Sequence, residues 1–197
     1  MRLNSAREAW HQAYYQPWDS VMTHVLEMAQ LEASVQKTEK QRGAGHAAHQ
    51  ALAAHIQYAI DRKLPGYVRA FGHWMYSPLA NDDHRETAEA AVMLFAYDRH
   101  GRMTAKKAER ARYVAAGVLY RYRRMHQGGQ SSMPDPLAAP EAFRGWLLGE
   151  YGIKLSSEQW GREWGGFVQH CFDVCNDIDK QALGPVAAII AEMKEAA

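Results

Sequence analysis

Residues 141–170 read EAFRGWLLGEYGIKLSSEQWGREWGGFVQH and are the most informative part of this 197-residue chain. Apolar side chains recur at spacings of three and four on both sides of Gly152, which predicts two helices joined by a turn. Ser156 followed by Gln159 is a capping box, so the second helix is expected to begin there. Its apolar stripe continues through Trp160, Trp164, Phe167, Cys171, Val174 and Ile178. The pattern is typical of a helix-turn-helix, whose second helix lies in a DNA major groove.

The polar face of that second helix supplies candidate DNA contacts. Arg162 suits bidentate pairing with a guanine, and Gln159 suits pairing with an adenine. Ser156 and Ser157, at the expected helix N-terminus, are placed to contact phosphate, and Lys154 adds positive charge. The alternative is an ordinary helical hairpin, whose second helix is held by two core tryptophans and whose arginine pairs with a neighbouring glutamate.

Three short runs resemble a known family. Residues 155–162, LSSEQWGR, resemble the Leu-[Ser/Thr]-x-x-x-Trp-x-Arg run near the C-terminus of the lambda-type phage Q late-gene transcription antiterminators. Residues 132–134 (SMP) followed by 142–145 (AFRG) are similar to that family's Met-Pro and Ala-aromatic-Arg-small sequence. Residues 94–97 (LFAY) resemble its Phe-Ala-Tyr helix. The resemblance covers roughly the last third of the chain, is thin over the middle and is faint before residue 90. An AlpA-type bacterial relative of Q is the kind of protein that it implies.

The resemblance implies a sequence-specific DNA-binding antiterminator that loads at a promoter-proximal site. Such a protein contacts the β flap of RNA polymerase and the σ factor, and the modified polymerase reads through terminators. One departure is clear, because the family's zinc module with two Cys-x-x-Cys pairs has no counterpart here. Two alternatives stay open: a conventional helix-turn-helix repressor or activator, and a non-DNA adaptor or anti-defence protein that uses a basic helix on an acidic partner.

That basic helix is expected over residues 104–126, with Thr104 as its cap. Residues 98–126 hold nine Lys or Arg against two acids, a local charge of +7, while the remaining 14 basic and 20 acidic residues give −6. Such a concentration suits a phosphate backbone. The alternative is a solvated helix face. The candidate contacts are Lys106, Lys107, Arg110, Arg121 and Arg124, with Gly117 on the same face. Residues 83–112, with Lys106, Lys107 and Arg110, form a second possible helix-turn-helix.

The rest of the chain reads as an all-α helical bundle with no alternating, strand-like segment. Residues 1–127 are expected to form a helical body, 128–140 a Gly/Ser/Pro linker, and 141–197 the motif with the C-terminal helices; the two parts are free to pack as one domain. Gly184-Pro185 is expected to break the last helix. Besides the motif, helices are expected over residues 4–15, 18–41, 46–62, 67–76, 83–100, 104–126 and 186–193.

No enzyme class finds support in the sequence. There is no glycine-rich phosphate loop and no nucleophile elbow, so we expect neither catalysis nor a cofactor. His46 and His49, or His170 with Cys171 and Cys175, have metal-ligand spacing, but both thiols fall on the apolar stripe, so no metal site is expected. The chain also lacks a run of about 20 apolar residues and a signal peptide. We therefore expect a cytoplasmic, nucleoid-associated protein without a membrane partner.

Overall fold

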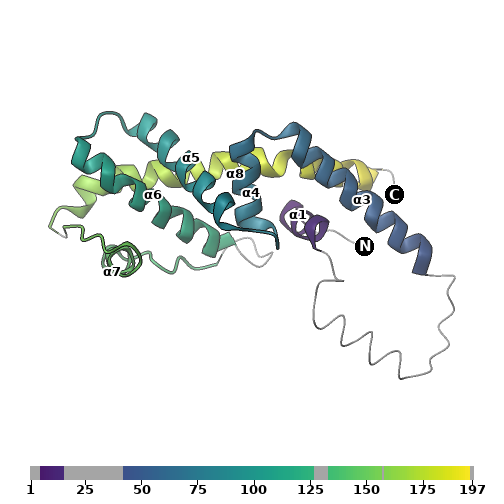
Figure 1. Ribbon diagram of the computed structural model, residues 1–197, viewed down its shortest axis with the longest axis horizontal. Helices are drawn as coiled ribbons and strands as arrows, with labels where there is room; N and C mark the ends of the chain where they lie inside the picture. Colours follow the sequence, from purple (N-terminus) through teal and green to yellow (C-terminus); the bar gives the residue numbers. More distant parts are fainter. Residues whose placement is uncertain (1–4, 16–41, 127–132, 157, 196–197) are drawn as a thin grey trace, which may run out of the picture.

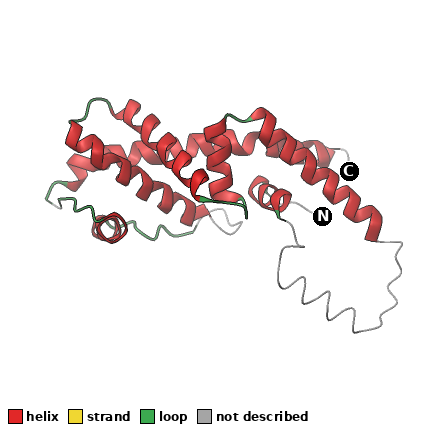
Figure 2. Ribbon diagram, in the orientation of Figure 1, coloured by secondary structure: helices red, strands yellow, loops and turns green. Residues whose placement is uncertain are grey.

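The computed structural model describes residues 5–15, 42–126, 133–156 and 158–195, and in these ranges it contains helices and loops but no strand (Figure 2). The expectation of an all-α fold is confirmed. The helices are α1 (Ala6–Tyr14), α3 (Arg42–Lys63), α4 (Gly66–Tyr76), α5 (Asp82–His100), α6 (Ala105–His126), α7 (Pro140–Tyr151), the π-helical turn η3 (Gly161–Gly165) and α8 (Gly166–Glu195). In the described ranges, no helix combines the length and apolar character that crossing a bilayer requires.

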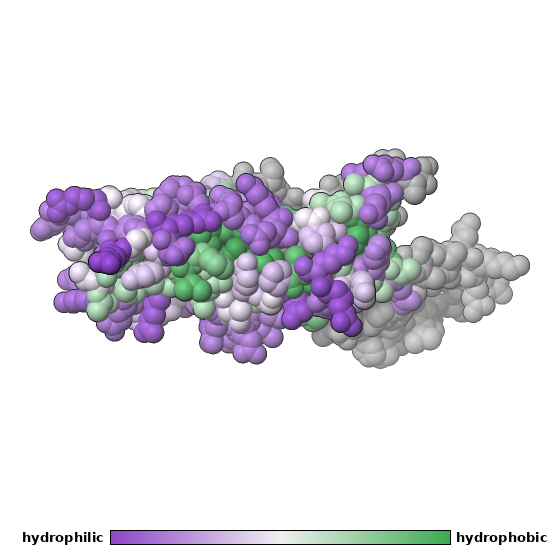
Figure 3. Space-filling view, turned by 90° about the horizontal axis from the view of Figure 1, so that it is seen from above, coloured by the Kyte–Doolittle hydropathy of each residue, from purple (hydrophilic) through white to green (hydrophobic). Residues whose placement is uncertain are grey.

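Helix α8 is the spine of the molecule. It has 30 residues and is therefore about 45 Å long. Figure 1 shows it running along the elongated molecule, and α1, α3, α4, α5 and α6 all pack against it. The expected apolar stripe is confirmed, since Phe167, Cys171, Val174 and Ile178 are at most 2% exposed. Viewed from above, hydrophobic residues also gather in the middle of the surface, between hydrophilic ends (Figure 3).

Two expected boundaries of α8 are wrong. Helical structure starts at Trp160 and passes through η3, so the expected capping box at Ser156 does not open it. The Gln159 side chain accepts a hydrogen bond from Arg162 instead of reaching back to a cap. At the other end, α8 continues through Pro185. Proline weakens a helix locally, but Ala182 and Val186 are fully buried on either side and hold the two halves in line.

The other expected helices lie close to their predicted positions. Ser5 caps α1, and Thr104 caps α6 by accepting the Lys107 amide at 3.3 Å. Asn81, rather than Asp83, caps α5 by accepting the His84 amide at 2.9 Å. Helix α3 begins at Arg42, four residues before its expected start. The expected helix 18–41 and the Gly-Gly stop after residue 127 lie outside the described residues.

One buried carboxylate joins four helices. Asp179 of α8 is 5% exposed and forms an ion pair with Arg7 of α1 at 3.1 Å. It also accepts hydrogen bonds from the hydroxyls of Tyr76 on α4, at 2.5 Å, and Tyr122 on α6, at 3.1 Å. A buried charge is costly unless it is paired and hydrogen-bonded, and Asp179 has both kinds of partner. This cluster therefore fixes how α1, α4 and α6 meet the spine.

Candidate nucleic-acid interface

A recess at one end of the bundle brings together residues from two distant parts of the sequence. Its volume is about 280 Å³, and it lies between the first two turns of α6 and residues 155–164. We call it the basic recess. The side chains that line it are Thr104, Lys106, Lys107, Arg110, Leu155, Ser156, Glu163 and Trp164. Four of the residues that the sequence offered as DNA contacts, Lys106, Lys107, Arg110 and Ser156, therefore meet here.

The turn between α5 and α6 aims the start of α6 at this recess. Gly101 ends α5 with φ at 81°, a backbone conformation that glycine adopts without strain. Thr104 then caps α6, whose unpaired amides and dipole make its N-terminus favourable for an anion. The Lys107 ammonium lies 5.3 Å above the ring of Trp164, so the buried tryptophan positions this cation at the wall. The arrangement suits a phosphate group.

The proposed base-reading side chains lie on the surface beside the recess. Arg162 and Gln159 are both exposed, and Arg162 donates a hydrogen bond to the Gln159 carbonyl oxygen. A base pair read by these two groups must replace that bond. Lys154 is exposed two residues before Ser156, and Ser157 lies outside the described residues. Glu163 adds one negative charge to the wall of the recess, and its repulsion restricts which anions can bind there.

Arg121 is not available for DNA, so its prediction as a phosphate contact is wrong. It is 9% exposed, and its guanidinium binds Asp135 at 2.5 Å. The guanidinium also lies 5.0 Å from the ring centre of Phe143 and 4.9 Å from that of Phe172. Burial opposes ionisation of Asp135, but the hydrogen bonds from Arg121 and the Leu137 amide lower the pKa of this carboxyl below its ordinary value. The pair fastens residues 133–137 to α6.

The middle of the expected basic face also turns inward at Gly117. Gly117 is buried, and a Cβ placed on it would lie 2.6 Å from the Phe143 ring. Arg124 is exposed, but it lies 18 residues after Lys106, about 27 Å along the helix axis. Helical spacing correctly grouped these residues on one side but could not show that α7 covers its middle. Only the first two turns of α6 contribute cations to the recess.

The structure does not confirm a helix-turn-helix. Helix α7 packs on α6, where Trp146 stacks on Tyr120 with ring centres 4.8 Å apart. Its contacts with the start of the second helical segment include the edge-to-face pair of Phe143 and Trp160, at 5.8 Å, and the Arg144 guanidinium, which lies 5.6 Å from the centre of the Trp160 ring. The first helix of a helix-turn-helix instead supports the second directly. The exposed turn around Arg162 is thus held by aromatic contacts and not by a two-helix unit.

Sequence reasoning missed a histidine pair behind the recess. The rings of His100 and His170 lie 5.7 Å apart, and His100 packs edge-on against Phe167. Burial lowers the pKa of His100, and the nearby Lys107 and His170 lower it further. The available signal was the position of His100 directly before Gly101, which brings it to the α5–α6 turn.

The cysteines belong to the core. Cys171 and Cys175 are fully buried, and burial raises the pKa of both thiols. In the described ranges, no group of three or more His, Cys, Asp or Glu side chains is arranged to hold a metal ion. The side chain of His46 lies outside the described part of the chain.

Comparison with protein-family models, curated proteins and solved structures gave no significant match.

Proposed function

We propose that this protein is a DNA-binding transcription regulator that holds a DNA phosphate at the basic recess. The convergence of Lys106, Lys107 and Arg110 with Ser156, about 50 positions away in sequence, carries this proposal. Three cations, a hydroxyl and a helix N-terminus all favour the same kind of group, a phosphate. Arg162 and Gln159, exposed next to the recess, then face the neighbouring base edges.

The more specific proposal is a Q-type transcription antiterminator. Its support is the resemblance of residues 155–162 to the lambda-type Q family, because this run supplies Leu155 and Ser156 to the recess and Arg162 to the surface beside it. On this proposal the protein loads at a promoter-proximal DNA site and moves onto RNA polymerase through the β flap and σ factor. Its place of action is the bacterial nucleoid.

Binding measurements at two salt concentrations test the recess. Fluorescence anisotropy is measured on short duplexes tiled across the promoters around the gene, with a scrambled duplex as reference. Lys106→Ala combined with Arg110→Ala is expected to weaken binding to all duplexes alike and to reduce the salt slope by about one unit per lost phosphate contact. The matched control is Arg62→Ala with Lys63→Ala, two exposed cations at the end of α3, and it should bind as the wild type does. Equal losses in both double variants would remove the recess from the DNA contact.

Arg162→Ala tests base reading separately. We expect a loss of about 1–3 kcal/mol on the preferred duplex and little change on random DNA, because one base contact disappears while the phosphate contacts remain. A similar loss on both would assign Arg162 to the backbone. An inverted-repeat site would favour a conventional repressor or activator, and an asymmetric site beside a pause element would favour the antiterminator. If no duplex is preferred, the adaptor alternative takes precedence.

A further inference from the structure

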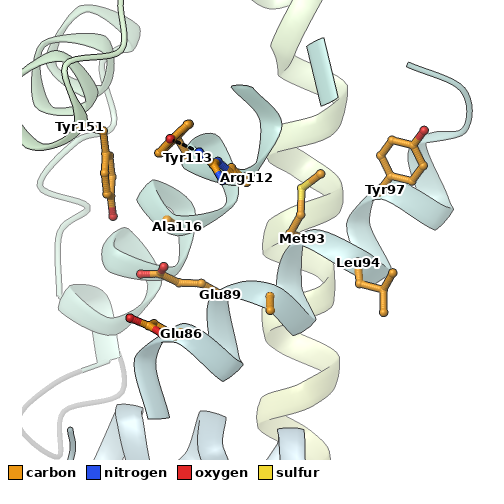
Figure 4. A pocket seen from close by; sticks show the side chains of 10 residues that line it. Glu86, Glu89, Met93, Leu94, Tyr97, Arg112, Tyr113, Ala116 and Tyr151 are labelled. Atoms are coloured by element: carbon orange, nitrogen blue, oxygen red, sulfur yellow. Dashed lines mark hydrogen bonds between the residues drawn. The ribbon is translucent and has the colours of Figure 1, made fainter. Parts of the chain in front are cut away.

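An open apolar groove lies between α5 and α6, and it shares no lining residue with the basic recess. Its volume is about 890 Å³. Ala90, Met93 and Leu94 of α5 line one side, and Tyr113 and Ala116 of α6 line the other (Figure 4). Leu94 is 64% exposed although it is a large apolar residue.

The charges of the groove are sorted along its length. Glu86 and Glu89 follow each other at a spacing of three, so their carboxylates share one face of α5. They lie about 21 Å and about 17 Å from the end of α5 at the inter-helix turn, whereas Arg112 lies about 10 Å from that turn along α6. The groove therefore has an acidic end and, about 7–11 Å nearer the turn, a cation at the level of the apolar residues Met93 and Leu94 (Figure 4).

These charges have few partners within the chain. Arg112 lies over the ring of Tyr113 at 4.4 Å and donates a hydrogen bond to its hydroxyl, but no carboxylate in the described ranges pairs with it. In the same ranges Glu86 forms no ion pair, and Glu89 meets only Arg85, at 3.9 Å. Glu89 is half-buried at the groove wall. A partner that brings a cation to Glu86 and Glu89, and a carboxylate to Arg112, is the complement of this surface.

We propose that the groove binds a second copy of this chain through a two-fold axis that passes between its acidic end and Arg112. A two-fold interface uses the same patch on both subunits, so the patch must be self-complementary. Here the rotation sets Glu86 and Glu89 of each copy against Arg112 of the other and buries Leu94. Helix α8 covers the opposite side of α5 and α6, so two α5–α6 pairs would form a four-helix contact between two spines.

A charge-swap experiment on the full chain tests the dimer. The first variant is Glu86→Arg with Glu89→Arg, and the second is Arg112→Glu. Each variant alone places like charges together at both ends of the interface, so its dimer dissociation constant is expected to rise by more than about 100-fold. A mixture of the two restores opposite charges at both ends, so a heterodimer should form. Analytical ultracentrifugation measures the mass, which is 22.3 kDa for one copy.

The controls separate charge from folding. Lys180→Glu and Glu192→Arg change exposed charges on α8, outside the groove, and should remain dimeric. Circular dichroism melting checks that each variant is folded. If a charge variant is unfolded, Leu94→Glu replaces it, because this exposed side chain contributes little to the fold and a carboxylate there would face Glu86 and Glu89 of the second copy and should give a monomer.

Three results would overturn the proposal. They are a monomeric wild type at about 100 μM, dimers that persist in both charge variants, and folded charge variants that fail to associate when mixed. Binding of DNA is read independently on the same samples, since the groove and the basic recess have no residue in common.

Discussion

His73 of α4 shows how burial alone sets the charge of a side chain. It is 8% exposed and packs edge-on against Trp10 and Tyr14 of α1, with ring centres 5.7 Å and 4.7 Å away. The ring of His84 on α5 stacks on it at 4.7 Å. Burial, with a smaller contribution from His84, lowers the pKa of His73 from 6.5 to about 4. At neutral pH this histidine is therefore an uncharged core residue.

Stability should consequently fall in mild acid. His73 takes up a proton below about pH 6.5 in the unfolded chain, but only below about pH 4 in the folded chain. The nearby Asp61 raises the pKa of His73 and Arg69 lowers it, and neither reverses the effect of burial. The free energy of unfolding should drop by about 2 kcal/mol between about pH 7.5 and about pH 5. Urea titrations at both pH values measure it. His73→Gln should reduce the drop, whereas His55→Gln, at an exposed position on α3, should keep it.

Arg121 shows where residue-scale prediction stopped. Its type and spacing matched those of Lys106 and Arg110, which do line the recess, and only Asp135 distinguishes it. That aspartate lies 14 positions later, beyond the described end of α6, so helical periodicity gave no reason to pair the two. Sequence identified all three cations of the recess, Lys106, Lys107 and Arg110, but not that Arg121 has a partner inside the protein.

The contact between α6 and α7 depends on a glycine, Gly117, at the point where the two helices meet. At Gly117 the rings of Phe143 and Trp146 occupy the space that a Cβ would need. Gly117→Ala should therefore lower the free energy of unfolding by about 1–3 kcal/mol through overpacking. Gly149→Ala on α7 is the control, because no heavy atom lies within 4 Å of its Cβ position and alanine favours the helix by about 1 kcal/mol. If both variants shift the urea midpoint upward, α7 does not pack on α6 in this way.

At the scale of helices, the sequence predicted which segments are helical better than it predicted the residues at which each helix begins and ends. The caps at Ser5 and Thr104 and the stop at Gly101 are local signals, and those positions were predictable. The helix through Pro185 was not, because the dipeptide Gly-Pro favours a break locally while burial of distant partners against Ala182 and Val186 favours continuity. Burial of this kind is invisible to a short sequence window.

For the molecule as a whole, the Asp179 cluster connects the N-terminal helix α1 to the C-terminal helix α8. Removing Arg7 leaves a buried carboxylate without its cation, so Arg7→Leu should destabilise the protein by about 3 kcal/mol. Arg7→Leu combined with Asp179→Leu should cost less than the sum of the two single changes, since no charge is left unpaired. Urea unfolding of the four proteins completes the cycle. Additive losses would show that the two residues act independently.

The all-α fold was predictable from composition and periodicity, but the arrangement around α8 was not. The apolar stripe from Phe167 to Ile178 indicated a buried face without indicating what covers it. Its covering helices come from residues 6–126, and pairings over such separations leave no repeating pattern in one sequence. The buried Asp179 gave no signal either, because it looks like an ordinary surface residue until its partners are known.

The ion pair of Arg7 with Asp179 also limits how early in synthesis the protein can fold. The two residues are 172 positions apart, and a bacterial ribosome adds about 5–20 residues per second, so Arg7 leaves the peptidyl-transferase centre roughly 9–35 s before its counterion exists. The nascent chain cannot finish its core during that interval, because the spine that α1, α3, α4, α5 and α6 share is translated after all of them. Synthesis of α8, rather than emergence of the N-terminus, is therefore the event that lets this core form.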